Sequence, residues 1–272
     1  MPKILISLVI TSILFSSLFA ITDIAPVGFE DKSTGFSGSV FGSFKIKSGN
    51  TNKEEADYGG RIQYDSKKHI TWLQANIERG TASDIITEDS IFLHLRHISQ
   101  LYTQDWAIEY YAQYKHDKFK SIKNRTLYGI GSRYRLVNSK KYGKLFLGVS
   151  ALTENINYLT SNNNVGLNPD EYNYRISSYI SYKKPINNTF DISLLTYYQP
   201  KINNTSDFMT STSSEMTIHL TKVIDLSYIM SFDYDSTPAI DIKKIDIVQK
   251  LSFIYRFGKD DPVSRYTENL LK

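Results

Sequence analysis

The chain has 272 residues, with 32 lysines and arginines against 28 acidic residues, so its net charge is only +4. This small excess gives no reason to expect binding to nucleic acid. The sequence contains no cysteine, which excludes disulfide bonds, thiol chemistry and attachment of a lipid through a cysteine. Its 20 tyrosines and 14 phenylalanines are typical of strand-rich chains, because strands favour aromatic residues.

The N-terminus has the pattern of a secretory signal peptide. Lys3 supplies a positive charge, residues 4–19 form an apolar run, and Ala20 offers a small residue for cleavage. We therefore expect residues 1–20 to be a signal peptide and residues 21–33 to be a short periplasmic segment before the folded domain. An uncleaved membrane anchor is the alternative, since the apolar run is close to the shortest helix that spans a bilayer.

Between residues 34 and 257, segments of alternating apolar and polar residues are separated by short breaks rich in Asn, Asp, Lys, Ser and Gly. In the last of these segments, Leu251 and Phe253 leave one face while Lys250 and Arg256 leave the other. A period of two predicts a strand. A tilted strand of about 9–11 residues is long enough to cross a bilayer.

Twelve such segments follow one another along the chain. We expect strands over residues 35–47, 55–64, 69–79, 88–99, 105–115, 125–136, 144–156, 172–183, 189–199, 207–220, 225–235 and 246–257. The odd-numbered links are mostly longer than the even-numbered ones, as expected for such a barrel. Two even-numbered links, 99–105 and 137–143, are longer than this pattern predicts. The pattern predicts an all-β fold, an antiparallel up-and-down transmembrane β-barrel of about 12 strands over residues 34–257, followed by a polar tail over 258–272.

If the apolar face of these strands looks at lipid, the polar face lines the lumen. The charged side chains expected there include Arg61, Arg96, Glu109, Arg125, Arg133, Arg175, Glu215, Asp233 and Arg256, and Asp57, Glu78, Lys115, Arg135, Glu154, Asp191 and Lys250 share that face. Two interpretations are open, a lumen closed by Arg–carboxylate pairs or a narrow pore whose basic bias favours small anionic solutes. Paired arginines would favour the closed barrel, and unpaired ones the pore.

Catalysis at the barrel surface would need a base and a nucleophile near the extracellular rim. Of the five histidines, only His116, beside Asp117, is expected there, and such a pair in a lysine-rich loop is typical of solvated surface. The chain has no common catalytic, phosphate-binding or metal-binding motif. We expect a protein that is not an enzyme, with no catalytic residues, metal or cofactor. The alternatives are a surface lipid-modifying or proteolytic barrel enzyme, and a soluble periplasmic barrel that binds a small ligand and buries its apolar side chains inside.

The last predicted strand ends in an aromatic residue after a run of alternating apolar positions. This pattern resembles the terminal signal by which outer-membrane barrels are recognised for assembly, and the residues that carry it are Leu251, Phe253, Tyr255 and Phe257. We therefore expect the barrel assembly machinery, periplasmic chaperones and outer-membrane lipid as partners. The polar residues after Phe257 depart from this pattern, because the signal normally ends the chain.

Three segments, residues 36–52, 128–136 and 234–257, resemble in order and spacing an uncharacterised family of salt-induced outer-membrane proteins of bacteria. The resemblance implies a β-barrel in the outer membrane of a Gram-negative cell. It implies no catalytic residue, because the activity of the family is undetermined, and Phe36 stands where the family often has tryptophan. Together with the residue pattern, it predicts a non-enzymatic envelope protein that is either structural or a narrow solute channel.

Overall fold

The computed structural model describes residues 34–47, 53–83, 85–159 and 170–258. The predicted signal peptide, the predicted periplasmic segment up to residue 33 and the tail from residue 259 lie outside the described residues. Within the described ranges, no helix is both long enough and apolar enough to cross a membrane.

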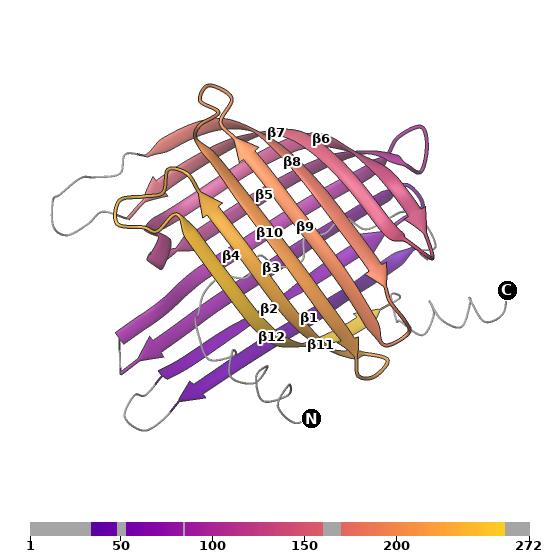
Figure 1. The fold of residues 1–272 in the computed structure, drawn as a ribbon, viewed down its shortest axis with the longest axis horizontal. Coiled ribbons are helices and arrows are strands. Elements are labelled where there is room, and N and C mark those ends of the chain that lie inside the picture. Colours follow the sequence, from indigo (N-terminus) through magenta and orange to yellow (C-terminus); the bar gives the residue numbers. More distant parts are fainter. Residues whose placement is uncertain (1–33, 48–52, 84, 160–169, 259–272) are drawn as a thin grey trace, which may run out of the picture.

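Twelve strands and one short 3-10 helix make up the fold. The strands are β1 (Gly35–Lys47), β2 (Lys53–Asp65), β3 (His69–Ala82), β4 (Ile85–Gln100), β5 (Trp106–Asp117), β6 (Ile122–Ser139), β7 (Gly143–Tyr158), β8 (Glu171–Pro185), β9 (Phe190–Pro200), β10 (Phe208–His219), β11 (Ile224–Asp235) and β12 (Ile245–Gly258), and η2 (Lys118–Lys120) lies between β5 and β6. Each strand pairs with its sequence neighbours, and β12 pairs with β1 (Figure 1). The predicted all-β, antiparallel, 12-stranded barrel is therefore confirmed.

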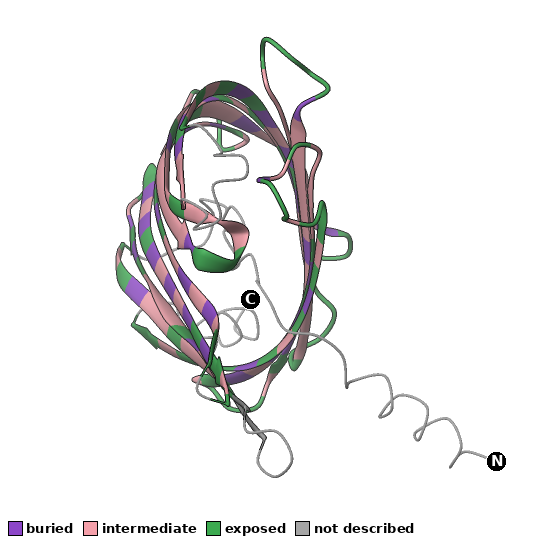
Figure 2. Ribbon diagram, turned by 90° about the vertical axis from the view of Figure 1, so that its left-hand side faces the viewer, coloured by how far each residue is buried: buried purple, intermediate pink, exposed green. Residues whose placement is uncertain are grey.

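The alternation of the sequence becomes the two faces of the barrel wall. Figure 2 shows buried and exposed residues alternating along the strands. Phe253 and Tyr128, on the apolar face, are each 60% exposed, whereas Arg133, on the polar face, is 2% exposed. Because the barrel is closed, the exposed apolar face is the outside and the buried charged face is the interior.

The two ends of the barrel differ in their links. We call the end where β1 begins and β12 finishes the near end, and the opposite one the far end. The near-end links are 66–68, 101–105, 140–142, 186–189 and 220–223, and the far-end links are 48–52, 83–84, 118–121, 159–170, 201–207 and 236–244. Most far-end links are longer, as the sequence predicted. The link between β3 and β4 is an exception.

Two predicted links are wrong, and β-bulges lie beside both errors. The loop expected over 80–87 is mostly strand, because Ala82 pairs with Ile85 beyond a register shift between Gly80 and Thr81. The long link expected over 137–143 shrinks to 140–142, because β6 continues to Ser139 after a shift between Arg135 and Val137. A bulge inserts one residue and breaks the period of two, which makes the strand look shorter in the sequence.

Candidate functional site: the barrel interior

A layer of five side chains joins opposite walls of the barrel in its near half. We call it the closing layer, and it consists of Arg96, Glu109, Arg133, Tyr179 and Tyr197. Tyr179 Oη donates to both carboxylate oxygens of Glu109 at 3.0 Å, and Arg96 Nη1 and Arg133 Nε each lie 3.6 Å from this carboxylate. Arg96 Nη2 also donates to Tyr197 Oη at 3.5 Å, which links β4 to β9. All five are buried, so the layer bridges the lumen between β4 and β9.

Aromatic and apolar side chains support the closing layer. The guanidinium carbon of Arg96 lies 5.7 Å from the centroid of the Trp72 ring, and that of Arg133 lies 4.9 Å from the centroid of the Phe146 ring. Such cation–π contacts gain strength where water is excluded. Trp72 belongs to a buried cluster with Ile70, Ile98 and Ala107. The closing layer therefore packs against aromatic side chains of β3 and β7.

Glycines in β6 and β7 make room for the inward tyrosines. A Cβ atom added at Gly129 would lie 2.2 Å from Cζ of Tyr111, and one added at Gly148 would lie 2.1 Å from Cε1 of Tyr179. A tyrosine ring can lie flat on the inner wall only where the facing residue has no side chain. These two glycines therefore position aromatic rings that line the interior.

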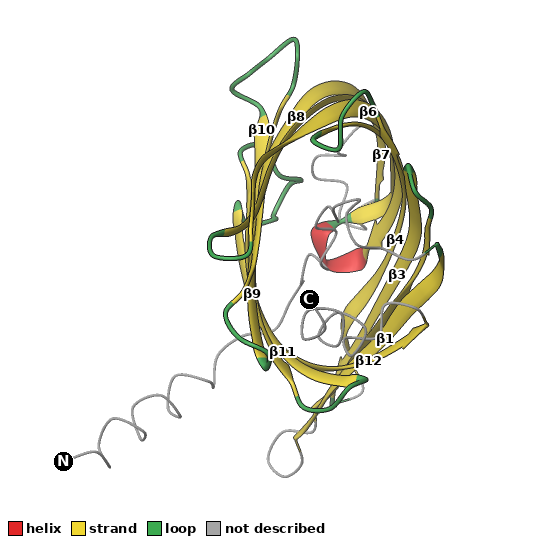
Figure 3. Ribbon diagram, turned by 90° about the vertical axis from the view of Figure 1, so that its right-hand side faces the viewer, coloured by secondary structure: helices red, strands yellow, loops and turns green. Residues whose placement is uncertain are grey.

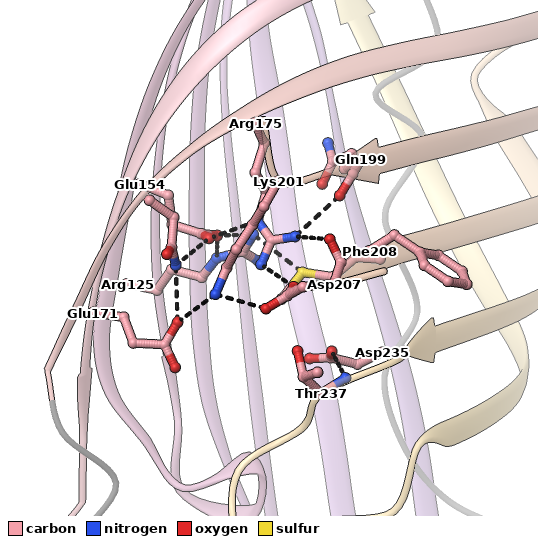
Figure 4. Close-up of polar contacts among 12 residues, drawn as sticks. Arg125, Glu154, Glu171, Arg175, Gln199, Lys201, Asp207, Phe208, Asp235 and Thr237 are labelled. Carbon is pink, nitrogen blue, oxygen red and sulfur yellow. Dashed lines mark hydrogen bonds and ion pairs between the residues drawn. The ribbon is translucent and has the colours of Figure 1, made fainter. Parts of the chain in front are cut away.

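A second ion-pair network lies toward the far end, and Figure 4 shows its members, Arg125, Glu154, Glu171, Arg175, Lys201 and Asp207. Glu154 is fully buried and accepts a hydrogen bond from Arg125 Nε (2.5 Å) and another from Arg175 Nε (3.0 Å). Arg175 Nη2 lies 3.0 Å from Asp207 Oδ1. We call this set the far-end network. It holds β6, β7 and β8 to the link before β10.

The link 201–207 contributes two charged groups whose pKa values are shifted. Burial alone lowers the pKa of Lys201, but hydrogen bonds with Asp207 and Glu171 outweigh burial and raise that pKa above its usual range. Burial raises the pKa of Asp207, but the hydrogen bond from Lys201 and the charge of Arg175 outweigh it, so the pKa of Asp207 is lowered. Both groups are therefore held in their charged forms.

Between the closing layer and the far end the lumen contains a cavity of about 230 Å³. Helix η2 lies within the ring of strands (Figure 3). Its Lys120 Nζ is 2.6 Å from Asp246 Oδ2 and 3.9 Å from Asp233 Oδ2, on the opposite wall. At its start, Asp117 accepts a hydrogen bond from the backbone N–H of Lys120 at 3.0 Å. The helix thus narrows the mouth of what we call the far-end cavity.

Two further ion pairs lie beside β1 and β12. Lys250 on β12 pairs with Asp57 on β2, and so reaches across β1. Arg256 pairs with Asp225. The Oδ1 atom of Asp225 also lies 2.7 Å from His219 Nδ1. The inner charges of this wall are therefore paired locally.

The chain matches one protein family over most of its length. The family model described as "Protein of unknown function, DUF481" matches residues 41–257. The chain belongs to this family. The family description names neither a function nor an inducing condition, so the resemblance is confirmed only as far as an uncharacterised family. No curated protein matches the chain.

Among solved structures, the barrel is similar to the NanC porin (13% identity, TM-score 0.45, covering 81% of this chain and 97% of that chain). It is also similar to the KdgM porin (10% identity, TM-score 0.41, covering 82% of this chain and 100% of that chain). A third similar structure is the translocator domain of the autotransporter NalP from Neisseria meningitidis (12% identity, TM-score 0.43, covering 84% of this chain and 91% of that chain). At such low identities and TM-scores, nothing about ligand or activity follows for this DUF481 protein.

The structure distributes the nine charged residues expected in the lumen over several places. Arg96, Glu109 and Arg133 meet in the closing layer, and Arg125 and Arg175 meet at Glu154 in the far-end network. The other four make separate contacts, namely Arg61 with Gln63, Glu215 with Thr217 and Ser227, Asp233 with Lys120, and Arg256 with Asp225.

Several important interior residues were absent from the sequence prediction. Tyr179 lies four residues after Arg175 on the same strand, so the period of two was enough to place its side chain inward. Tyr197 pairs with Tyr179 across β8 and β9 and shares that face. Lys201 and Asp207 lie in a link, where alternation gives no signal.

The structure does not bring His116 and Asp117 together. As consecutive residues of β5 they leave opposite faces of the wall. His116 Nδ1 lies 2.7 Å from the carbonyl oxygen of Lys123, whereas Asp117 is buried inside and 3.0 Å from Lys115 Nζ. In the parts of the chain that the structure describes, no group of three or more metal-ligating side chains could hold a metal ion.

Proposed function

We propose that this DUF481 protein is a non-enzymatic β-barrel of the Gram-negative outer membrane, with a lumen that is closed in this conformation. The observation that carries the proposal is an outer wall of exposed apolar side chains around an interior of paired charges. A soluble barrel would place these groups the other way round, because contiguous apolar surface in water is rare beyond a few hundred Å². The soluble periplasmic alternative is therefore disfavoured.

Aromatic side chains at both ends of the outer wall support a position in the bilayer. The near end of the outer wall exposes Phe36, Tyr64 and Trp106, and the far end exposes Tyr172 and Tyr174. Membrane barrels carry such girdles at the two interfaces. The shortest strand has 11 residues and the longest 18, so every strand is long enough to cross.

The pairing of the inward arginines favours a closed barrel over an open pore. Arg96, Arg133 and Arg175 each contact a carboxylate inside the barrel. The far-end cavity keeps a narrow anion-favouring pore as the second candidate, since a solute from outside would need only a break in the closing layer to pass. Planar-bilayer recording separates the two. We expect no steady conductance from the wild type, and steps from Glu109→Ala, which removes the central carboxylate. Steady anion-selective current from the wild type would instead establish the pore.

Cell fractionation tests the location. We expect recovery with the outer membrane and heat-modifiable migration of the detergent-purified protein. Recovery as a soluble periplasmic monomer would contradict the proposal.

We also propose the outer face of β12 as the assembly signal. Leu251, Phe253, Tyr255 and Phe257 are all exposed there, where the assembly machinery and periplasmic chaperones have access before closure. Replacing Phe257 by Ser should slow assembly in a reconstituted system, while Tyr128→Ser, on β6, should not. Equal rates for both variants would refute this role.

A further inference from the structure

The seam between β1 and β12 is paired over only part of its length. Among the described residues, its pairs run from Ser37 opposite Gly258 to Gly42 opposite Phe253 and then stop. Yet β1 remains paired with β2 as far as Lys47, and β12 remains paired with β11 as far as Ile245. Both strands therefore continue toward the far end, but not with each other, and Figure 1 shows them running apart in that direction.

One outer side chain of β1 beyond the last pair is strongly exposed. Phe44, beyond the last pair, is 81% exposed, whereas Phe36, at the other end of β1, is 63% exposed. On the inside, the ion pair between Lys250 and Asp57 crosses β1 beside Ser43, the first residue without a β12 partner. Lys250 Nζ also lies 5.2 Å from the centroid of the Phe41 ring. We call residues 43–47 of β1 and 245–252 of β12 the open seam. These contacts lie at its boundary toward the near end.

Unpaired strand edges are unstable in hydrocarbon, because nothing there can bond to their N–H and C=O groups. At membrane depth such backbone is tolerated where it lines a hydrated cavity. The far-end cavity borders this edge, since Asp246 of the open seam lines it, as do the polar side chains of Asn76 and Glu78 of β3. The open seam therefore lies between the bilayer and a chamber inside the barrel.

The lining of this chamber mixes charged side chains such as Lys120, Arg125 and Asp233 with apolar ones. Leu127, Ile156, Phe92 and Met209 line it, and Leu127 and Ile156 are buried. At the rim, Lys243 and Lys244 are exposed, and for neither is an ion pair found among the described residues. The chamber thus combines apolar side chains with charged ones, and it carries two lysines at its rim.

We propose that the far-end cavity binds an amphiphile with an alkyl chain and an anionic head group, and that this amphiphile enters from the bilayer through the open seam. The alkyl chain lies against Leu127, Ile156 and Met209, and the carboxylate or phosphate head lies near Lys243 and Lys244. The cavity of about 230 Å³ is below the range of about 300–1,000 Å³ for small-molecule sites, so it takes part of one alkyl chain and not a whole two-chain lipid. The inference rests on the proposed membrane location.

The experiment uses quenching of tryptophan by brominated alkyl chains. The chain has only two tryptophans and no cysteine, so a tryptophan probe and a pair of cysteines that lock the seam can be introduced without interference from native residues. The probe is Phe92→Trp in a W72F/W106F background, because Phe92 lines the cavity. The lock is Phe44→Cys with Leu251→Cys, joined by a reducible bis-maleimide linker across the open seam. A matched control joins Val40→Cys to Tyr255→Cys, which already face each other in the paired part.

Two arms distinguish the source of the amphiphile, vesicles of brominated phosphatidylglycerol and unbrominated vesicles with added dibromostearate. We expect quenching of the introduced tryptophan in at least one arm, a decrease of at least twofold when the open seam is locked, and recovery when the linker is reduced. Recovery in the same sample shows that the lock did not unfold the protein. The control lock should change nothing. Replacing Lys243 and Lys244 by Gln should weaken quenching by dibromostearate at least threefold.

Quenching that is absent, or that is equal with and without the lock, would overturn the inference. The variant W72F, which keeps Trp106 on the outer wall, separates this failure from a failure of the membrane location. If Trp106 is quenched and the cavity probe is not, the barrel lies in the bilayer but its cavity takes no alkyl chain.

Discussion

Removing the charge of Glu154 should destabilise the barrel strongly. Its carboxylate lies between two guanidinium groups, with Arg125 Nε 2.5 Å from one oxygen and Arg175 Nε 3.0 Å from the other. The substitution Glu154→Gln keeps the size of the side chain and leaves both cations without this partner. Removing one member of a buried ion pair costs about 3–5 kcal/mol, most of it from the charge left behind.

The structure places the expected loss at the lower end of that range. Arg175 keeps Asp207 and hydrogen bonds to the carbonyl oxygens of Gln199 and Asp207, and Arg125 is partly exposed. We therefore expect a loss of about 3 kcal/mol in the free energy of unfolding. The measurement is urea unfolding in lipid vesicles, followed by tryptophan fluorescence.

Glu171→Gln is the matched control, because it makes the same chemical change on the neighbouring strand. The side chain of Glu171 is 32% exposed and pairs with Lys201, so its loss should cost about 0–1 kcal/mol. If Glu154→Gln stayed within about 0.5 kcal/mol of the wild type, or matched Glu171→Gln, the argument from buried pairing would be wrong.

Three further predictions concern other parts of the interior. Gly129→Ala should cost about 1–3 kcal/mol in urea unfolding, because its Cβ would overlap the Tyr111 ring, and it should cost little in a Tyr111→Ala background; an equal cost in both backgrounds would argue against this contact. Because the folded pKa of Asp207 is lowered, this group stabilises the barrel above its unfolded pKa of about 3.9, and the contribution is lost as the pH falls through the folded value. Asp207→Asn should therefore flatten the acid side of the stability–pH curve, and an unchanged curve would contradict the pairing. Lys120→Met should release η2 from Asp246 and speed hydrogen exchange at residues 118–120 but not in β3; unchanged exchange at η2 would show that the ion pair does not hold it.

The sequence predicted most of the fold because one physical rule acts along its whole length. In a barrel with lipid outside and charge inside, each strand has to alternate, so strand number, order and facing follow from the period of two. The rule fails where an extra residue is inserted. The extra residues are Thr87 in β4, opposite Gly80 and Thr81, and Leu136 in β6, and there the predicted links were wrong.

The interior was less predictable, for a different reason. Alternation shows which way a side chain faces but not which opposite strand it meets. That Tyr179 donates to Glu109, and that Arg96 reaches Tyr197, depends on how closely the two walls approach. Gly148, opposite Tyr179 on the neighbouring strand, leaves room for the Tyr179 ring, and this role is visible only in the structure.

The central claim is that the apolar wall faces lipid while the charged wall faces the lumen, and the two native tryptophans test it directly. Trp106 lies on the outer wall and is 46% exposed, whereas Trp72 lies inside and is 1% exposed. In vesicles of lipids brominated near the head group, W72F, which retains Trp106, should be quenched strongly. W106F, which retains Trp72, should be quenched several-fold less. Equal quenching, or stronger quenching of Trp72, would contradict this arrangement.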